Sequence, residues 1–333
     1  MGYFKRLYLL VVLSICAFEV NGQNNFEYWQ QRVDYKMDVK MDVGSHTYTG
    51  TQNLIYTNNS PDDLDVVFYH LYYNAFQPGS EMDIRSITIS DPDSRVDDRI
   101  SMLKKEDYGF INVLSLTQGG DPINFNVAGT VLEVKLSVPI KSGSSTELKM
   151  VFEGQVPPVI RRAGKNSSEG VALSMAQWYP KMAEYDFEGW HADPYIGREF
   201  HGVWGDFDVK LSIDKNYTVG GTGYLQNPEE VGHGYGEKIT KDDSDLITWH
   251  FIAPDVHDFT WAADPNFTHD TITVPNGPVL HFLYKTSLGE GYKKSWRKLQ
   301  PMASEIIQHY SNSIGKYPYE QYSIIQGGDG GME

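Results

Sequence analysis

Apolar side chains occupy every second position between residues 35 and 43, and charged side chains fill most of the positions between them. A period of two gives a β-strand one buried face and one solvent-facing face. Gly44-Ser45 then offers a turn, and residues 48–57 return as a second strand that ends at Asn58-Asn59-Ser60-Pro61. The pattern therefore predicts two consecutive antiparallel strands.

The same alternation recurs further along the chain. It is carried by two sets of four apolar residues: Leu132, Val134, Leu136 and Val138, and then Phe207, Val209, Leu211 and Ile213. Residues 66–73 form a denser apolar and aromatic run, which suits a strand covered on both faces. Short strands with frequent turn residues predict stacked antiparallel sheets, and the lack of a fixed-period repeat argues against a propeller or solenoid.

The periodicity changes after residue 285. Apolar residues now lie three or four apart, as on one face of a helix: Trp296, Leu299, Ala303, Ile306, Ile307, Tyr310 and Ile314. Pro301 falls inside this pattern, so the helix either starts near Gln300 or kinks at the proline, and Gly315 is a natural stop. Residues 322–326 predict a short strand. We therefore expect a β domain over residues 23–285 and the incomplete start of an α/β domain over residues 286–333.

Composition and charge narrow the functional classes. The chain has 333 residues, of which 40% are hydrophobic and 13% aromatic, so it can bury one large or two ordinary cores and is not disordered. Its formal charge is −16, from 28 basic and 44 acidic residues. Such a field repels phosphate backbones, which argues against nucleic-acid binding, and mildly favours cationic ligands such as the free amino group of a peptide.

The first 22 residues have the pattern of a signal peptide. Lys5 and Arg6 precede an apolar run over residues 7–18, and a cut ahead of Gln23 would release the mature chain. The alternative is a lipoprotein signal at Cys16, although Ile15 is larger than the residue that usually precedes such a cysteine. No second apolar stretch is long enough to span a membrane. We therefore expect an exported bacterial protein in the periplasm, the cell envelope or the medium.

The tail is rich in glycine, with four glycines among residues 327–331. Without Cβ atoms, its backbone groups are open to an extended peptide laid beside them, and Glu333 could bind the terminal ammonium of that peptide. The alternative is a flexible turn with a solvated acid. No Gly-Lys-Ser/Thr follows the glycines, so a phosphate-binding loop is excluded.

The tail and the residues before it resemble a known family. Tyr317-Pro318-Tyr319, Ser323-Ile324-Ile325-Gln326 and Gly330-Gly331-Met332-Glu333 look like the aminopeptidase N and leukotriene hydrolase family of gluzincins, which carries a Gly-x-Met-Glu exopeptidase motif in this context. Gly331 stands where many members have alanine. Further matches to the bacterial branch run from about Tyr35 to the end, through residues 177–180, 199–200, 205–209, 217–223 and 255–262.

The resemblance implies a fold and a role for specific residues. It implies an antiparallel β-sheet amino-terminal domain, then a thermolysin-like catalytic domain, in a zinc aminopeptidase whose substrates are peptides with a free amino terminus. Glu333 would anchor the amine, and Gly330, Gly331 and Met332 would bind the peptide backbone. Gln177 would line the pocket for the first side chain, the alternative being a packed glutamine at a strand end.

The catalytic zinc of that family is held by a His-Glu-x-x-His helix and a later glutamate, with the first glutamate activating the metal-bound water. None of the 10 histidines here is followed by Glu-x-x-His. The resemblance therefore implies that the zinc ligands lie beyond Glu333. We expect this chain alone to contain no metal site and no catalytic residue, and to be inactive.

Other chemistry finds less support in the sequence. Four potential ligands cluster at His191, Asp193, Glu199 and His201, but their spacing fits no metal motif, and polar residues at a domain interface explain them more simply. No Gly-x-Ser-x-Gly elbow supports a serine hydrolase. Two alternatives to an active peptidase remain: a non-catalytic β module that binds peptide or glycan on its aromatic residues, and an inactive relative of the peptidase.

Overall fold

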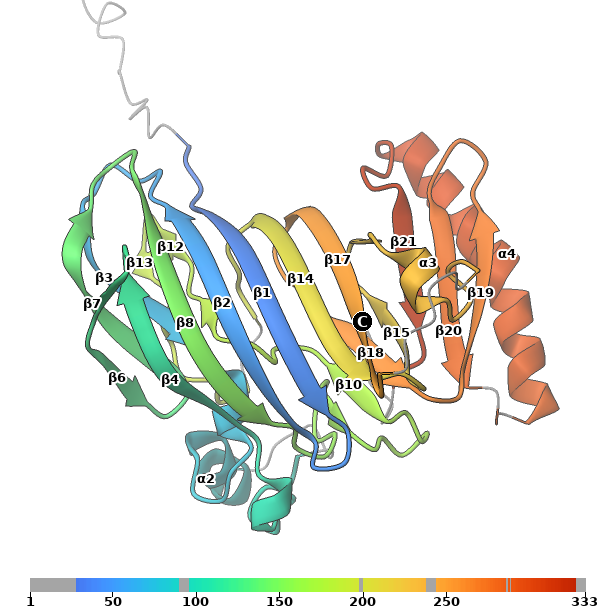
Figure 1. The fold of residues 1–333 in the computed structure, drawn as a ribbon, viewed down its shortest axis with the longest axis horizontal. Coiled ribbons are helices and arrows are strands. Elements are labelled where there is room, and N and C mark those ends of the chain that lie inside the picture. Colours follow the sequence, from blue (N-terminus) through green and yellow to red (C-terminus); the bar gives the residue numbers. More distant parts are fainter. Residues whose placement is uncertain are drawn as a thin grey trace, which may run out of the picture.

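The structure, a computed structural model, describes residues 28–89, 96–197, 200–237, 244–285, 287 and 289–327. Strands dominate these residues, and nearly all of their pairings are antiparallel (Figure 1). The fold class predicted from the alternating pattern, mainly β with antiparallel sheets, is confirmed.

The largest sheet has eight strands in the order β16-β17-β14-β1-β2-β8-β4-β5. Within it only β1 and β14 pair in parallel. Its strands have the following bounds: β1 Arg32–Asp42, β2 Thr47–Thr57, β4 Phe110–Gln118, β5 Asp121–Pro122, β8 Ser145–Gln155, β14 Gly205–Asp214, β16 Tyr224–Leu225 and β17 Leu246–Val256.

The predicted pair of strands at the centre of this sheet is confirmed. Along β1, Tyr35, Met37, Val39 and Met41 are at most 4% exposed, while the charged residues between them face solvent. β2 returns antiparallel, with Asp42 opposite Thr47. In the turn, the backbone N–H of Gly44 donates to Oδ1 of Asp42 at 2.8 Å, and this bond holds the pKa of the Asp42 carboxyl below its usual value.

Two smaller sheets lie against the large one (Figure 1). The first has the order β11-β3-β7-β6, with β3 Leu64–His70, β6 Phe125–Ala128, β7 Val131–Ile140 and β11 Lys181–Met182. The second, which we call the junction sheet, has the order β15-β18-β10-β9, with β9 Gly164–Lys165, β10 Leu173–Met175, β15 Thr218–Gly221 and β18 Trp261–Asp264. A short hairpin joins β12 Tyr185–Asp186 to β13 Gly189–Trp190.

Two details of the predicted strands differ from the structure. The apolar run over residues 66–73 is a strand only as far as His70, and it then continues into a 3-10 helix, η1 Tyr72–Ala75. Val138 lies in β7 but is 67% exposed. The reason is that Oε1 of Gln118 accepts hydrogen bonds from the N–H groups of both Ser137 and Val138, which breaks the alternation at the end of the strand. The other helices that the structure describes before residue 240 are short: α2 Glu81–Thr88, η2 Lys105–Asp107 and α3 Pro228–Val231.

The carboxyl-terminal residues form a separate three-stranded sheet in the order β19-β20-β21, with α4 packed on one face (Figure 1). Its elements are β19 Phe267–Thr273, β20 Val279–Lys285, α4 Glu290–Ser313 and β21 Gln321–Ile325. Because β19 and β20 precede residue 285 and β21 follows it, this sheet spans the domain boundary expected from the change of periodicity. The boundary itself stays a prediction.

The helix α4 begins at Glu290 and continues through Pro301, so the alternative in which it starts near Gln300 is wrong. Trp296, Leu299, Ala303 and Ile307 pack against the three-stranded sheet, whereas Tyr310 and Ile314 of the predicted apolar face are 56% and 82% exposed. None of the described helices combines the length and hydropathy needed to cross a membrane.

Candidate functional site

The predicted substrate-binding residues are only partly visible. Gln177 is described and follows β10 in the junction sheet. Gly330, Gly331, Met332 and Glu333 lie outside the described residues. The site can therefore be built from Gln177, from the strands around it, and from the start of the tail at Gln326-Gly327.

Gln177 lies in a turn with an unusual backbone. Its φ is +54°, in the left-handed region that residues other than glycine rarely adopt. The residue is 8% exposed. The neighbouring Trp178 is fully buried; its indole N–H donates to the carbonyl of Phe259 at 3.0 Å, and its own carbonyl accepts from the hydroxyl of Tyr48. Such backbone conformations persist where the surroundings hold them in place, and they concentrate at functional sites.

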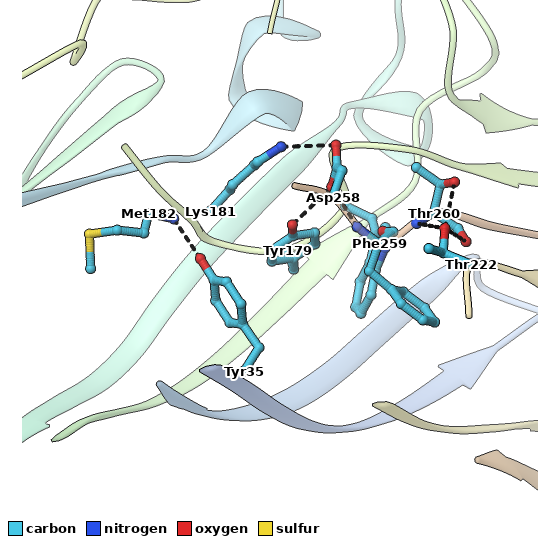
Figure 2. Close-up of polar contacts among 9 residues, drawn as sticks. Tyr35, Tyr179, Lys181, Met182, Thr222, Asp258, Phe259 and Thr260 are labelled. Atoms are coloured by element: carbon cyan, nitrogen blue, oxygen red, sulfur yellow. Dashed lines mark hydrogen bonds and ion pairs between the residues drawn. The ribbon is translucent and has the colours of Figure 1, made fainter. Parts of the chain in front are cut away.

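A buried ion pair between Lys181 and Asp258 is hydrogen-bonded to Tyr179, two residues after Gln177 (Figure 2). Nζ of Lys181 lies 2.9 Å from Oδ2 of Asp258, and the two side chains are 3% and 17% exposed. Oδ1 of Asp258 accepts from the hydroxyl of Tyr179 at 2.9 Å and from the N–H of Phe259 at 2.8 Å. Burial, reinforced by the charge of Asp258, raises the pKa of Tyr179 well above its usual value, so the phenol stays protonated and donates.

Further hydrogen bonds connect this pair to the strands on either side (Figure 2). The hydroxyl oxygen of Tyr35, on β1, accepts from the N–H of Met182 at 2.8 Å. The N–H of Thr260 donates to Oγ1 of Thr222 at 3.1 Å, and the N–H of Thr222 donates to the carbonyl of Thr260 at 2.9 Å. Residues 178–182, which follow Gln177, are thus held by Tyr35 on β1, by Tyr48 on β2 and by residues 258–259 before β18.

The three-stranded sheet docks directly on the junction sheet. Oγ of Ser323 donates to the carbonyl of Gly221 at 3.3 Å. At Gly220, a Cβ would lie 2.7 Å from Cδ1 of Ile325 and 3.0 Å from a methyl group of Leu283. A side chain at position 220 would therefore have to displace the ends of the Ile325 and Leu283 side chains, which pack on this glycine.

A second buried ion pair fixes the end of β21. Nζ of Lys285 donates to Oδ2 of Asp264 and to the carbonyl of Gly170, both at 2.6 Å, and the Asp264 side chain is 1% exposed. The backbone N–H of Lys285 donates to Oε1 of Gln326 at 2.9 Å. These contacts were not predicted. The available signal was a lysine that closes the mostly apolar run over residues 279–284.

The contacts also define the direction of the tail. β21 passes Gly221 at Ser323 and Gly220 at Ile325, so it runs opposite to β15. Through Lys285, Gln326 lies near Gly170, which precedes β10, whereas Gln177 follows the other end of β10. The described part of the tail is therefore brought to the segment before β10, and joint binding by Gln177 and Glu333 stays a prediction.

A cavity of about 230 Å³ lies between the β domain and the carboxyl-terminal residues. Its wall includes Gly223 and Thr260 on one side and Tyr317, Tyr319 and Tyr322 on the other. The hydroxyl of Tyr319 donates to the carbonyl of Asp255, and burial raises the pKa of Tyr317 to about 12. Burial also raises the pKa of Tyr319, so the phenols of Tyr317 and Tyr319 are protonated at neutral pH and can act as hydrogen-bond donors.

The potential ligands around His191 lie elsewhere, on and beside the β12–β13 hairpin. Nε2 of His191 is 2.8 Å from Oδ2 of Asp186, and its ring centroid is 4.9 Å from that of His201. Ligand atoms of Asp186, Glu188 and His191 lie within 4.8 Å of one another. Two contacts that stabilise the hairpin explain why these groups lie together: the Asp186–His191 pair, and the hydrogen bond from the N–H of Glu188 to Oδ1 of Asp186. Glu199 lies outside the described residues.

The residues of this chain do not fit the zinc centre of the resembling family. That centre needs two histidines one helical turn apart, and no histidine in the sequence is followed by Glu-x-x-His. Among the described residues, the one group of three potential ligands is Asp186, Glu188 and His191, on the hairpin.

Comparison with known proteins gives a relationship of fold. No family model and no curated protein matches the sequence. Among solved structures, a point mutant of an M1 zinc metallopeptidase from Deinococcus radiodurans, bound to a Tyr-Ser-Ala substrate, matches with a TM-score of 0.53 and 12% identity over 89% of this chain and 56% of that chain. The M1 zinc metallopeptidase of the same organism without a stated mutation matches with a TM-score of 0.50 and 11% identity over 90% and 57%.

A two-domain M1 zinc metallopeptidase mutant bound to L-tryptophan matches equally, with a TM-score of 0.50, 11% identity and coverage of 90% and 57%. This chain thus spans little more than half the length of the structures that it matches. At such identity the likeness concerns the fold alone. The chain shares its fold, at a distance, with part of the M1 zinc metallopeptidases.

Proposed function

We propose that this chain is the amino-terminal portion of a zinc-dependent aminopeptidase, which removes single residues from the amino ends of peptides. The observation that carries the proposal is the fold shared with M1 zinc metallopeptidases, one of them bound to a tripeptide. The Gly-Gly-Met-Glu sequence that follows β21 adds to it, since the same stretch carries the resemblance drawn from the sequence.

In this proposal the chain holds the peptide, and residues that follow Glu333 hold the zinc. The carboxylate of Glu333 pairs with the substrate ammonium, and the backbone at Gly330, Gly331 and Met332 binds the peptide chain. Gln177 lines the pocket for the first side chain. Its left-handed backbone supports this role, and so does the hydrogen bond that joins the nearby Tyr179 to the buried Lys181–Asp258 pair, because a substrate-positioning side chain needs a rigid base.

The remaining parts of the proposal concern the setting of the enzyme. Residues 1–22 export the protein as a signal peptide, and lipid attachment at Cys16 is the alternative. The substrates are peptides with a free amino terminus, and the net charge of −16 attracts that cationic end.

The test is an assay of the protein encoded by the whole gene. We expect hydrolysis of alanine or leucine p-nitroanilide, no hydrolysis of the same compounds with an acetylated amine, loss of activity with a chelator and recovery with zinc. The sequence after Glu333 separates the alternatives. A His-Glu-x-x-His helix supports the enzyme, the same fold with altered ligands indicates an inactive relative, and an unrelated sequence indicates a binding module.

A further inference from the structure

A second and larger cavity, of about 840 Å³, opens beside the β12–β13 hairpin. Its wall comes from residues 28–30, from the hairpin, from residues 200–204 and from His257, none of which lines the cavity between the β domain and the carboxyl-terminal residues. Six aromatic side chains contribute to it: Tyr28, Trp29, Tyr185, Phe187, Phe200 and Trp204. We call it the aromatic cavity.

Several of these rings are open to solvent. Phe187 is 84% exposed and Trp204 is 43% exposed, which is unusual for side chains of this size. The rings of Trp29 and Tyr185 stack with centroids 5.9 Å apart, and the ring of Trp204 lies 5.2 Å from that of His257. Ring faces held in place by neighbouring rings provide a binding surface that needs little ordering when a ligand arrives.

One carboxyl group in the wall has no cationic partner among the described side chains. Glu184 lines the cavity and is 9% exposed, and its carboxyl accepts a hydrogen bond from the N–H of Tyr185. The two basic side chains near it already have acidic partners, Lys181 with Asp258 at 2.9 Å and His191 with Asp186 at 2.8 Å. A buried carboxylate normally has a partner of opposite charge, so a bound cation could pair with Glu184 in this cavity.

The groups around Glu184 set its ionisation. The pKa of its carboxyl is raised to about 7, mainly by burial. Asp186 acts in the same direction, whereas the N–H of Tyr185, His191 and Lys181 act in the opposite direction. Burial, and to a smaller extent the charge of Glu184, raise the pKa of the buried Tyr56 on β2. Burial also lowers the pKa of the neighbouring His201, so this ring adds little positive charge above neutral pH.

We propose that the aromatic cavity binds an organic cation with an apolar body, such as a quaternary ammonium compound or the basic side chain of a peptide. Ring faces attract cations through their quadrupoles, and the carboxylate of Glu184 supplies the opposite charge. A sugar could stack on the same rings but would gain nothing from the charge. The site is separate from the proposed peptidase site, so either proposal can fail without the other.

The experiment compares benzyltrimethylammonium with neutral benzyl alcohol in calorimetric titrations of this chain. We expect the cation to bind at least about tenfold more tightly. Glu184→Gln keeps the shape and removes the charge, and it should weaken cation binding by about tenfold. Glu188→Gln is the matched control, because its carboxylate lies four positions away, is exposed and does not line the cavity. Trp204→Ala, at an exposed ring, should also weaken binding.

The pH dependence gives a second reading. The charge of benzyltrimethylammonium does not change with pH, whereas Glu184 ionises around pH 7. The affinity of the chain for benzyltrimethylammonium should therefore rise by about tenfold between about pH 6 and pH 8, and this rise should disappear in Glu184→Gln. A blocked lysine peptide that binds more tightly than the small cation would identify a peptide side chain as the source of the charge.

Equal binding of benzyl alcohol and the cation would overturn the proposal. So would cation binding that stays as tight as in wild type in both a folded Glu184→Gln variant and a folded Trp204→Ala variant. Binding of maltose that is insensitive to Glu184→Gln, without binding of the cation, would make the cavity a sugar platform instead.

Discussion

His70 lies at the end of β3 and carries an imidazole that is 5% exposed. Its Nε2 is 3.1 Å from the carbonyl oxygen of His191, so the neutral ring can donate one hydrogen bond there. Burial lowers the pKa of this ring to about 4. The folded chain therefore keeps His70 neutral in a pH range where an exposed histidine is protonated.

This difference makes stability depend on pH. Because the pKa of His70 is lower in the folded state than the ordinary value of 6.5, the unfolded chain takes up the proton first, and stability falls as the pH drops from about 6.5 to about 4. Between about pH 7.5 and pH 5 we expect His70 to account for a loss of about 2 kcal/mol in the free energy of unfolding.

Urea denaturation of wild type and His70→Gln at both pH values measures this contribution. The comparison between variants is needed because the raised pKa of Glu184 works in the opposite sense, removing stability as the pH rises. His309→Gln, in the helix α4, is the matched histidine control. A pH dependence that His70→Gln leaves unchanged would refute the assignment.

At the scale of elements, the Lys285–Asp264 pair ties β20 to the junction sheet. Lys285→Met leaves the carboxylate of Asp264, 1% exposed, without its cation. We expect this to lower the free energy of unfolding by about 3–5 kcal/mol, because an unpaired buried charge is expensive. Lys293→Met removes the same group from an exposed pair with Glu290 and should cost no more than about 0.5 kcal/mol. Similar losses in the two variants, measured by urea denaturation, would contradict the account.

The elements themselves could be predicted where local patterns decide them. The alternation in β1, β2 and β14 located these strands, and the change of period located α4. Which strands pair could not be predicted, because pairing depends on contacts between distant residues. Gly205 shows this: a Cβ there would lie 1.6 Å from the carbonyl oxygen of Val33, on the neighbouring strand β1, yet nothing near Gly205 in the sequence indicates that neighbour.

The candidate site was less predictable than the fold. Gln177 and the glycine-rich tail were predicted as binding residues through a family resemblance. Local sequence alone was equally compatible with a packed glutamine at position 177 and a flexible turn in the tail. The supporting pair Lys181–Asp258 joins residues 77 positions apart, as their numbers show. The aromatic cavity likewise gathers residues 28–30, 184–187 and 200–204, so no single stretch of sequence carries its signal.

For the whole molecule, we expect that residues 1–333 alone bind no catalytic zinc. The chain, expressed and dialysed, should hold well under one zinc ion per molecule by elemental analysis, because its histidines lack the spacing of a zinc site. Stoichiometric zinc that is lost in His191→Ala or His201→Ala would show that the hairpin cluster is a metal site after all.

The most direct test of the central claim concerns Glu333 in the full-length enzyme. If its carboxylate pairs with the substrate ammonium, Glu333→Ala removes a charge-assisted contact worth about 1.5–3 kcal/mol, or roughly 10- to 150-fold in kcat/KM. Glu333→Gln keeps one acceptor and should fall between wild type and Glu333→Ala. Peptides with a blocked amino terminus already lack the ammonium, so the substitution should cost them far less.

The quantity to measure is therefore the ratio of kcat/KM for free over blocked peptides, in wild type and in Glu333→Ala. The account predicts that this ratio falls by about 10-fold or more in the variant. An unchanged ratio would contradict it and show that Glu333 is not the amine anchor.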